Sequence, residues 1–234
     1  RRFVRAFHVG SGLFSFLATG AVILMLSLEP FLASWFALMG AVVGSFLNVV
    51  VYRLPRGYAL NIPSRSMCTS CNKQLQWFEN IPLLSFIIQR GKCSKCGAAI
   101  GARYFLIELI TSALFYAVYS HFGFTFNSLF YCAFVASLMA VTFIDIDFRI
   151  IPDEISIWGT VLALAASHWV EGLGLTAALI GAASASFLFW LMGFVYEKIT
   201  GREGLGFGDV KLLAFIGASL GAKGAFGTVI VSSF

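Results

Sequence analysis

Apolar residues occur in long blocks along most of the chain, separated by short polar segments. A helix needs about 20 apolar residues to cross the hydrocarbon core of a bilayer, which is roughly 30 Å thick. The blocks therefore predict an all-α polytopic membrane protein with about six to eight transmembrane helices. The expected spans cover residues 10–28, 31–52, 104–122, 127–148, 154–170 and 174–197, with a last stretch beginning at 210.

Two places in this pattern predict interruptions. Glu29 and Pro30 separate the first two blocks, either as a tight turn or as a kink in one long helix. Near the other end, a helix from Val210 to Leu220 would be only about 17 Å long at 1.5 Å per residue. We therefore expect a turn between two helices around 221–224, and membrane-embedded chain continuing past Phe234.

Composition excludes an ordinary soluble fold. Hydrophobic residues make up 59% of the 234 positions and charged residues only 12%, against about 25% charged in soluble domains. The net charge of +5 would suit nucleic-acid binding in a soluble protein, whereas in a membrane protein it more often reflects basic cytoplasmic loops. We expect the lipid bilayer, and no nucleic acid, as a partner.

The charges also predict an orientation and a division of the chain. Residues 53–103 contain eight basic side chains and one acid, Glu79, so the positive-inside rule places this loop in the cytoplasm. Alternation then places the segments 145–154 and 198–209 on the same side. The expected parts are an extra apolar segment 1–30, a span 31–53, a cytoplasmic loop domain 54–103 and a membrane core 104–234.

Two CxxC pairs lie in this loop, separated by 21 residues. Two residues between cysteines allow both sulfurs of a tight turn to face one point, so two such turns supply four thiolates for a tetrahedral zinc ion. Disulfides or a redox pair are the alternatives, but cytoplasmic thiols are kept reduced. Four protein ligands leave no position for water, which predicts structural zinc. The expected ligands are Cys68, Cys71, Cys93 and Cys96, while Cys132 is expected to pack inside a span.

Acidic residues at the ends of apolar segments are candidates for catalysis. Asp145 lies at the inner end of the block 127–148, and Asp209 directly precedes the last block, so the predicted topology places both at the cytoplasmic side. Two neighbouring carboxylates do not ionise together easily, so one stays protonated while the other acts as a base. That pairing predicts aspartyl proteolysis.

Simpler roles remain open for each acid. Asp209 and Asp153 are well placed as helix N-caps, and Asp145 could pair with Arg149 one turn later. Asp147 faces another side of the helix and is expected to be solvated or supporting.

Other protease chemistries find little support. The chain has neither the HExxH motif of zinc metalloproteases nor the GxSxG motif of serine hydrolases. Two non-protease interpretations remain: a zinc-bearing membrane docking protein, and a proton-coupled transporter that uses Asp145 as a relay.

Several ordered motifs resemble those of the type IV prepilin peptidases, which are aspartyl proteases of the GxGD class. The resemblance covers residues from about 35 to 221. Matching stretches are Gly44 to Pro55, the two CxxC pairs with Trp77 to Ser85 between them, Arg90 to Cys93, Arg103 with Glu108, Phe143 to Asp153, and Gly206 to Leu213.

The resemblance implies that Asp145 and Asp209 form the catalytic pair, with Gly206, Gly208 and Lys211 supporting the second motif. It implies prepilin or pseudopilin substrates with a short basic leader, cut at the cytoplasmic face of the bacterial inner membrane. It also implies N-methylation of the new terminus from S-adenosylmethionine, an activity associated with the cysteine-bearing loop. No residue is assigned to the methyl donor, and the oligomeric state and individual pilin substrate stay open.

Overall fold

The computed structural model describes residues 6–61, 67–68, 70–202 and 206–232, with the backbone alone for 6–27. These residues form helices and, apart from two isolated bridges, no β-structure. The all-α expectation is confirmed. The elements are α1 (Ala6–Arg53), η1 (Leu54–Arg56), η2 (Trp77–Asn80), α2 (Leu84–Ile88), α3 (Ala102–Phe122), α4 (Phe126–Phe148), α5 (Asp153–Ala166), α6 (Gly174–Thr200) and α7 (Phe207–Ser232).

Five helical segments within the described residues are long and apolar enough to cross a bilayer. They are Leu28–Arg56, α3, α4, α6 and α7, and each corresponds to an expected span. The expected span 154–170 is the shorter helix α5, whose 14 residues extend about 21 Å. Side chains of the first expected span, 10–28, lie outside the described residues, except that of Leu28.

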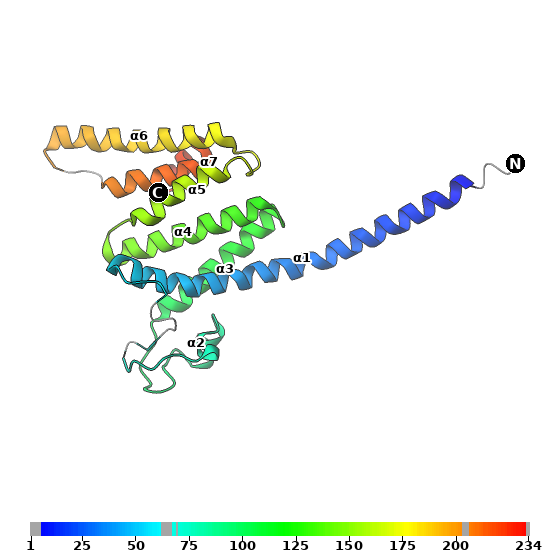
Figure 1. The fold of residues 1–234 in the computed structure, drawn as a ribbon, viewed down its shortest axis with the longest axis horizontal. Helices are drawn as coiled ribbons and strands as arrows, with labels where there is room; N and C mark the ends of the chain where they lie inside the picture. Colours follow the sequence, from blue (N-terminus) through cyan, green and yellow to red (C-terminus); the bar gives the residue numbers. More distant parts are fainter. Residues whose placement is uncertain (1–5, 62–66, 69, 203–205, 233–234) are drawn as a thin grey trace.

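α1 runs without a break through Pro30, so the chain forms one long helix there and not a tight turn. Its 48 residues correspond to about 72 Å at 1.5 Å per residue. The N-terminal part of α1 consequently extends far beyond the other helices (Figure 1). By the same alternation of spans, the sequence also predicts that Arg1, Arg2 and Arg5 lie on the side of the cysteine loop; these residues fall outside the described part of the chain.

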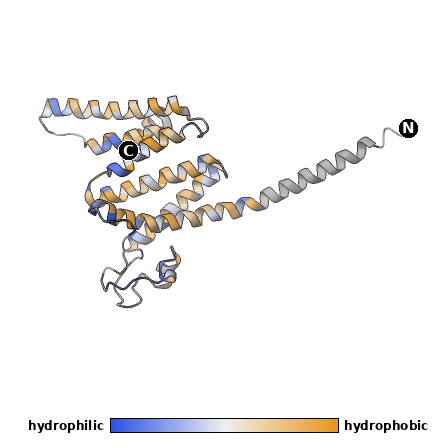
Figure 2. Cartoon of the chain, viewed as in Figure 1, coloured by the Kyte–Doolittle hydropathy of each residue, from blue (hydrophilic) through white to orange (hydrophobic). Residues whose placement is uncertain are grey.

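The remaining helices form two groups. α3 and α4 pack against the C-terminal half of α1, while α6 packs against α7 and α5 lies against α7 (Figure 1). The groups meet in an apolar core where the rings of Phe134 and Phe215 lie 5.2 Å apart. Apolar residues also cover the outside of the helices (Figure 2), as a lipid environment requires.

Glycines allow the closest helix contacts. A Cβ built on Gly217 would lie 2.2 Å from the carbonyl oxygen of Gly181, so the backbones of α6 and α7 touch directly. Gly40 and Gly44 bring α1 onto the backbone of α3 in the same way. Small residues are the usual means of close packing between membrane helices, because lipid supplies no hydrophobic force that drives helices together.

α7 contains the expected interruption. Gly221 has φ 68° and ψ 176°, a conformation outside the helical region, and divides α7 into two helical parts. The turn predicted around 221–224 is therefore confirmed. Because successive helices reverse direction, the loop after α1, the end of α4 and the start of α7 lie at the same end of the bundle (Figure 1).

Candidate active site and metal centre

The two expected catalytic acids lie at this common end, on different helices. Asp145 is in the last turn of α4 and Asp209 in the first turn of α7. Both residues are exposed in the bundle. α4 ends three residues after Asp145, at Phe148. The backbone N–H of the C-cap residue, Arg149, donates to the Asp145 carbonyl at 2.8 Å, and Arg149 takes a left-handed conformation. Each acid therefore stands where a helix meets a loop.

An arginine from the base of the cysteine loop holds the turn that carries Asp145. Arg103 donates to both carboxylate oxygens of Asp147, at 2.6 and 2.5 Å, and to the Phe143 carbonyl at 3.2 Å. Phe143 and Asp147 flank Asp145 by two residues on either side. The contact fixes the end of α4 against the start of α3.

A lysine two residues after Asp209 makes the corresponding contact on the other helix. The Lys211 ammonium lies 2.7 and 2.9 Å from the two carboxylate oxygens of Asp153. A Cβ on Gly208 would approach Ile151 Cβ to 3.1 Å, so a glycine lets the start of α7 lie against the α4–α5 loop. Nearby, the Asp209 amide donates to the Gly206 carbonyl at 3.1 Å. These contacts tie the start of α7 to the α4–α5 connection.

The simpler roles considered for the acids are mostly not the ones observed. The N-cap of α5 is Pro152, not Asp153, which pairs with Lys211 instead. Among the described residues, Arg149 makes no ion pair with Asp145 and contacts it through the backbone only. Asp147, expected to be solvated or supporting, is exposed and pairs with Arg103.

The four loop cysteines form one cluster. Their sulfur atoms all lie within 4.8 Å of one another, a group that could hold a metal ion. The Sγ atoms of Cys68 and Cys96 are 3.9 Å apart and those of Cys71 and Cys93 are 4.0 Å apart. A disulfide has an S–S distance of about 2.05 Å, and all four thiols are free. The structure therefore contains no disulfide among these four cysteines.

Both CxxC turns repeat one backbone pattern. The Cys68 amide donates to Lys73 and its carbonyl accepts from Asn72; the Cys93 amide donates to Ala98 and its carbonyl accepts from Gly97. Asn72 and Gly97, four residues after the first cysteine of each pair, both have positive φ, at 53° and 70°. The same turn is thus formed twice, with the cysteines directed to one centre.

The thiols differ in how readily they ionise. Backbone N–H groups of Cys96 and Lys95 lower the pKa of the Cys93 thiol to about 6. The pKa of Cys96 reaches about 11, since burial and the neighbouring thiols outweigh the lowering effect of the Ala98 amide. Four thiolates this close repel one another unless a cation compensates them, so the cluster favours a bound metal ion.

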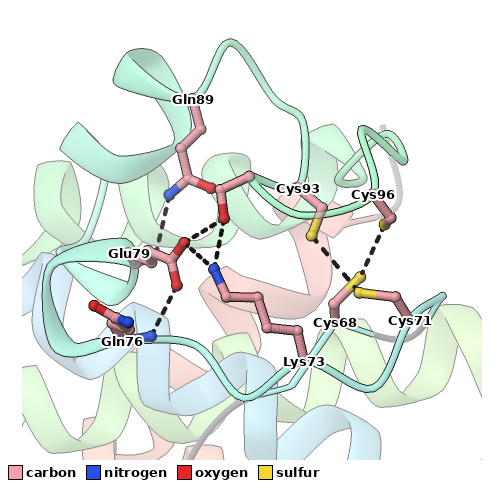
Figure 3. A network of polar contacts seen from close by, with 9 residues as sticks. Cys68, Cys71, Lys73, Gln76, Glu79, Gln89, Cys93 and Cys96 are labelled. Carbon is pink, nitrogen blue, oxygen red and sulfur yellow. Dashed lines mark hydrogen bonds and ion pairs between the residues drawn. The ribbon is translucent and has the colours of Figure 1, made fainter.

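A buried carboxylate organises the rest of the loop. Glu79 accepts hydrogen bonds from Lys73 Nζ at 2.7 Å and from the Gln76 amide at 2.9 Å (Figure 3). It also accepts one from the Ser94 hydroxyl. The Gln76 amide and Lys73 lower the pKa of Glu79 to about 2. Since Lys73 follows the first cysteine pair and Ser94 lies within the second, Glu79 joins the two turns.

The loop is also attached to α3. The Leu83 amide donates to the buried Glu108 carboxylate at 2.7 Å, and the rings of Phe86 and Phe105 stack with centroids 5.2 Å apart. Leu83 has a positive φ of 63°, which is unusual for a residue with a branched side chain. α2 is consequently held beside the first turns of a membrane-spanning helix.

The sequence did not indicate how these polar groups pair. Arg103 and Asp147 are 44 residues apart, and Lys211 and Asp153 are 58 apart. No local spacing predicts such contacts. Glu79, as the lone acid of a basic loop, was the one residue whose burial and pairing a charge count could have suggested.

Comparisons with known proteins identify the family. Residues 38–122 match the model described as Bacterial Peptidase A24 N-terminal domain, and residues 132–234 match the Type IV leader peptidase family. No solved structure matches.

Curated relatives named Prepilin leader peptidase/N-methyltransferase include proteins from three bacteria. The protein from Pseudomonas aeruginosa is 37% identical, over 84% of this chain and 75% of the relative. The one from Myxococcus xanthus is 38% identical, over 87% of this chain and 61% of the relative. The one from Neisseria gonorrhoeae is 36% identical, over 88% of this chain and 80% of the relative. These matches favour the peptidase over the docking and transporter interpretations, and the chain belongs to the Type IV leader peptidase family.

Proposed function

We propose that this chain is a membrane aspartyl endopeptidase that removes the basic leader from type IV prepilins or type II secretion pseudopilins. The observation that carries the proposal is the position of Asp145 and Asp209. They end one membrane helix and begin another at a single end of the bundle, within the region that matches the peptidase family.

Asp145 and Asp209 divide the chemistry between them. The ionised carboxylate takes a proton from water as the water oxygen attacks the scissile carbonyl carbon. The protonated carboxyl donates a hydrogen bond to the carbonyl oxygen, and a proton then passes to the leaving nitrogen as the C–N bond breaks. Gly206 and Gly208 shape the backbone beside Asp209, and Lys211 anchors the start of α7.

The metal that suits the cysteine cluster is Zn²⁺ in a structural role. With Zn–S bonds of about 2.3 Å, a tetrahedral site has S–S separations of about 3.8 Å. Two of the separations in the cluster are 3.9 and 4.0 Å, and all lie within 4.8 Å. Cys68, Cys71, Cys93 and Cys96 would hold the ion, which would join two turns in a loop with a small apolar core.

We place the cysteine loop and the acids on the cytoplasmic side of the bacterial inner membrane. The excess of basic residues in 53–103 supports this orientation through the positive-inside rule. The names of the relatives also support a second activity, N-methylation of the new terminus. S-adenosylmethionine would supply the methyl group. Among the described residues we assign none to its binding.

The decisive experiment compares the parent protein with Asp145→Asn and Asp209→Asn. Each variant is purified in detergent, mixed with a prepilin, and assayed for leader removal by mass spectrometry. We expect each substitution to lower the rate by about 10³-fold or more, because general acid–base catalysis alone contributes 10²–10⁴-fold.

Glu154→Gln is the matched control. Glu154 is an exposed acid at the same end of the bundle and makes no ion pair among the described residues. The Glu154→Gln variant should cleave the prepilin at the parent rate. Circular dichroism and zinc content establish that each variant is folded. Parent-like cleavage by either aspartate variant would contradict the assignment of the pair.

A further inference from the structure

The short helix α2 exposes an apolar surface on the cysteine loop. Leu84, Ile87 and Ile88 are 56%, 60% and 77% exposed, and their i, i+3, i+4 spacing places them on one face of the helix. Phe86, on another face, stacks on Phe105 of α3. α2 therefore buries one aromatic ring and leaves three aliphatic side chains uncovered.

The contacts of α2 fix its height relative to the bilayer. Phe105 and Glu108 belong to the first two turns of α3, and Glu108 lies about 9 Å along the helix from Ala102. The 21 residues of α3 extend about 31 Å, so the whole helix is needed to cross a hydrocarbon core of about 30 Å. An element docked on these turns lies at the edge of the bilayer, where exposed Leu and Ile side chains meet acyl chains.

The surroundings of this face match an interfacial helix. Arg90 and Lys92 follow α2 directly, are exposed, and make no ion pair with any residue in the described part of the chain. η2 packs beside α2 and carries Trp77, which is 80% exposed. Tryptophan is enriched where membrane meets water, and basic groups beside an apolar face attract anionic headgroups.

We propose that α2 is a membrane-interface anchor of the cysteine loop. Leu84, Ile87 and Ile88 insert among the lipid acyl chains, and Arg90 and Lys92 bind anionic headgroups at the surface. The charge argues against the leader of a substrate as the occupant, because the leader proposed above is itself basic and would be repelled.

Lipid photolabelling tests this directly. The whole chain is reconstituted into vesicles of phosphatidylcholine, with or without phosphatidylglycerol, containing a trace of lipid with a carbene precursor on its acyl chain. After illumination, mass spectrometry locates the adducts. We expect residues 84–88 to be labelled severalfold more than residues 93–96, and more strongly when phosphatidylglycerol is present.

Variants separate the two parts of the proposal. Ile87→Ser with Ile88→Ser should lower labelling of this segment severalfold while zinc content is retained, because Phe86 and Glu108 still dock α2. Arg90→Gln with Lys92→Gln should abolish the added effect of phosphatidylglycerol. Lys198 is an exposed basic residue at the end of α6. Lys198→Gln should leave both the labelling of 84–88 and the effect of phosphatidylglycerol unchanged.

Two results would overturn the anchor. Labelling of 84–88 no higher than that of 93–96, in zinc-loaded protein, would show that α2 does not reach the lipid. Loss of the label when a peptide of the prepilin apolar helix is added would show that substrate occupies this face. Neither readout requires cleavage, so a failure of the anchor proposal can be told apart from a failure of the peptidase proposal.

Discussion

The cysteine loop and the helical bundle are held together by different means. In the bundle, backbones meet directly at Gly181 and Gly217, and apolar side chains fill the core. In the loop, the ordered features are four converging thiols and the buried Glu79 network. A bundle packed by shape should fail when volume is added, whereas a loop joined by polar groups should fail when one group is removed.

The largest effect is expected where backbones touch. In Gly217→Ala, the new Cβ would lie 2.2 Å from a backbone oxygen of Gly181, so α6 and α7 must separate. We expect a loss of about 3 kcal/mol or more in stability. Cleavage should fall too, since α7 carries Asp209. Thermal unfolding in detergent and the prepilin assay measure these effects.

The same helix offers a control. A Cβ on Gly227 meets nothing within 4 Å. Gly227→Ala should be neutral or stabilising by up to about 1 kcal/mol, because alanine favours helix over glycine. Equal thermal stability of the two variants would show that the contact between α6 and α7 does not limit the stability of the bundle.

Removal of the proposed zinc ion should affect the loop alone. Chelation, or Cys93→Ser, should increase hydrogen exchange of residues 67–68 and 70–99 by orders of magnitude, because the binding free energy of a structural zinc ion is folding free energy. Exchange in α6 and α7 should stay unchanged. Cys132→Ala is the control, since this buried cysteine lies in α4 away from the cluster, and it should retain zinc. Coincident loss of the loop and the bundle would refute their independence.

The ionisation of Glu79 should make the stability of the loop depend on pH. Its pKa is about 2 in the folded protein and 4.5 ordinarily. A carboxylate with a depressed pKa stabilises the fold above its ordinary pKa, and this contribution is lost as the pH falls from about 4.5 through about 2.

Comparison with Glu79→Gln isolates this contribution, since effects of acid on the metal site are shared by both proteins. The difference in opening free energy of the loop, measured by hydrogen exchange, should be constant between pH 7 and 5 and shrink below pH 4.5. A difference that disappears already at pH 6 would contradict the ion pair with Lys73.

The sequence predicted the bundle well for a physical reason. Lipid requires long apolar segments, so composition alone located the spans, and the spacing of the two CxxC pairs predicted their convergence. The helix boundaries and the contacts between elements were harder to predict. The continuity of α1 through Pro30 and the N-cap of α5 at Pro152 were not predicted, and the ion pairs of Arg103 and Lys211 join residues 44 and 58 positions apart. Such contacts leave no periodic signal.

The smallest effect is expected at the ion pair between Lys211 and Asp153. Their side chains are 34% and 55% exposed, so solvent and salt screen the attraction, and such pairs contribute at most about 1 kcal/mol. Asp153→Asn should therefore lower cleavage a few-fold by loosening the start of α7, with little change in thermal stability. Glu154→Gln, the adjacent acid of the same turn, should have no effect. In a double-mutant cycle with Lys211→Met, the two substitutions should be non-additive, and the effect of each should diminish at high salt. Additive effects would mean that the pair does not position Asp209, and that the start of α7 is held by the contact of Gly208 with Ile151 alone.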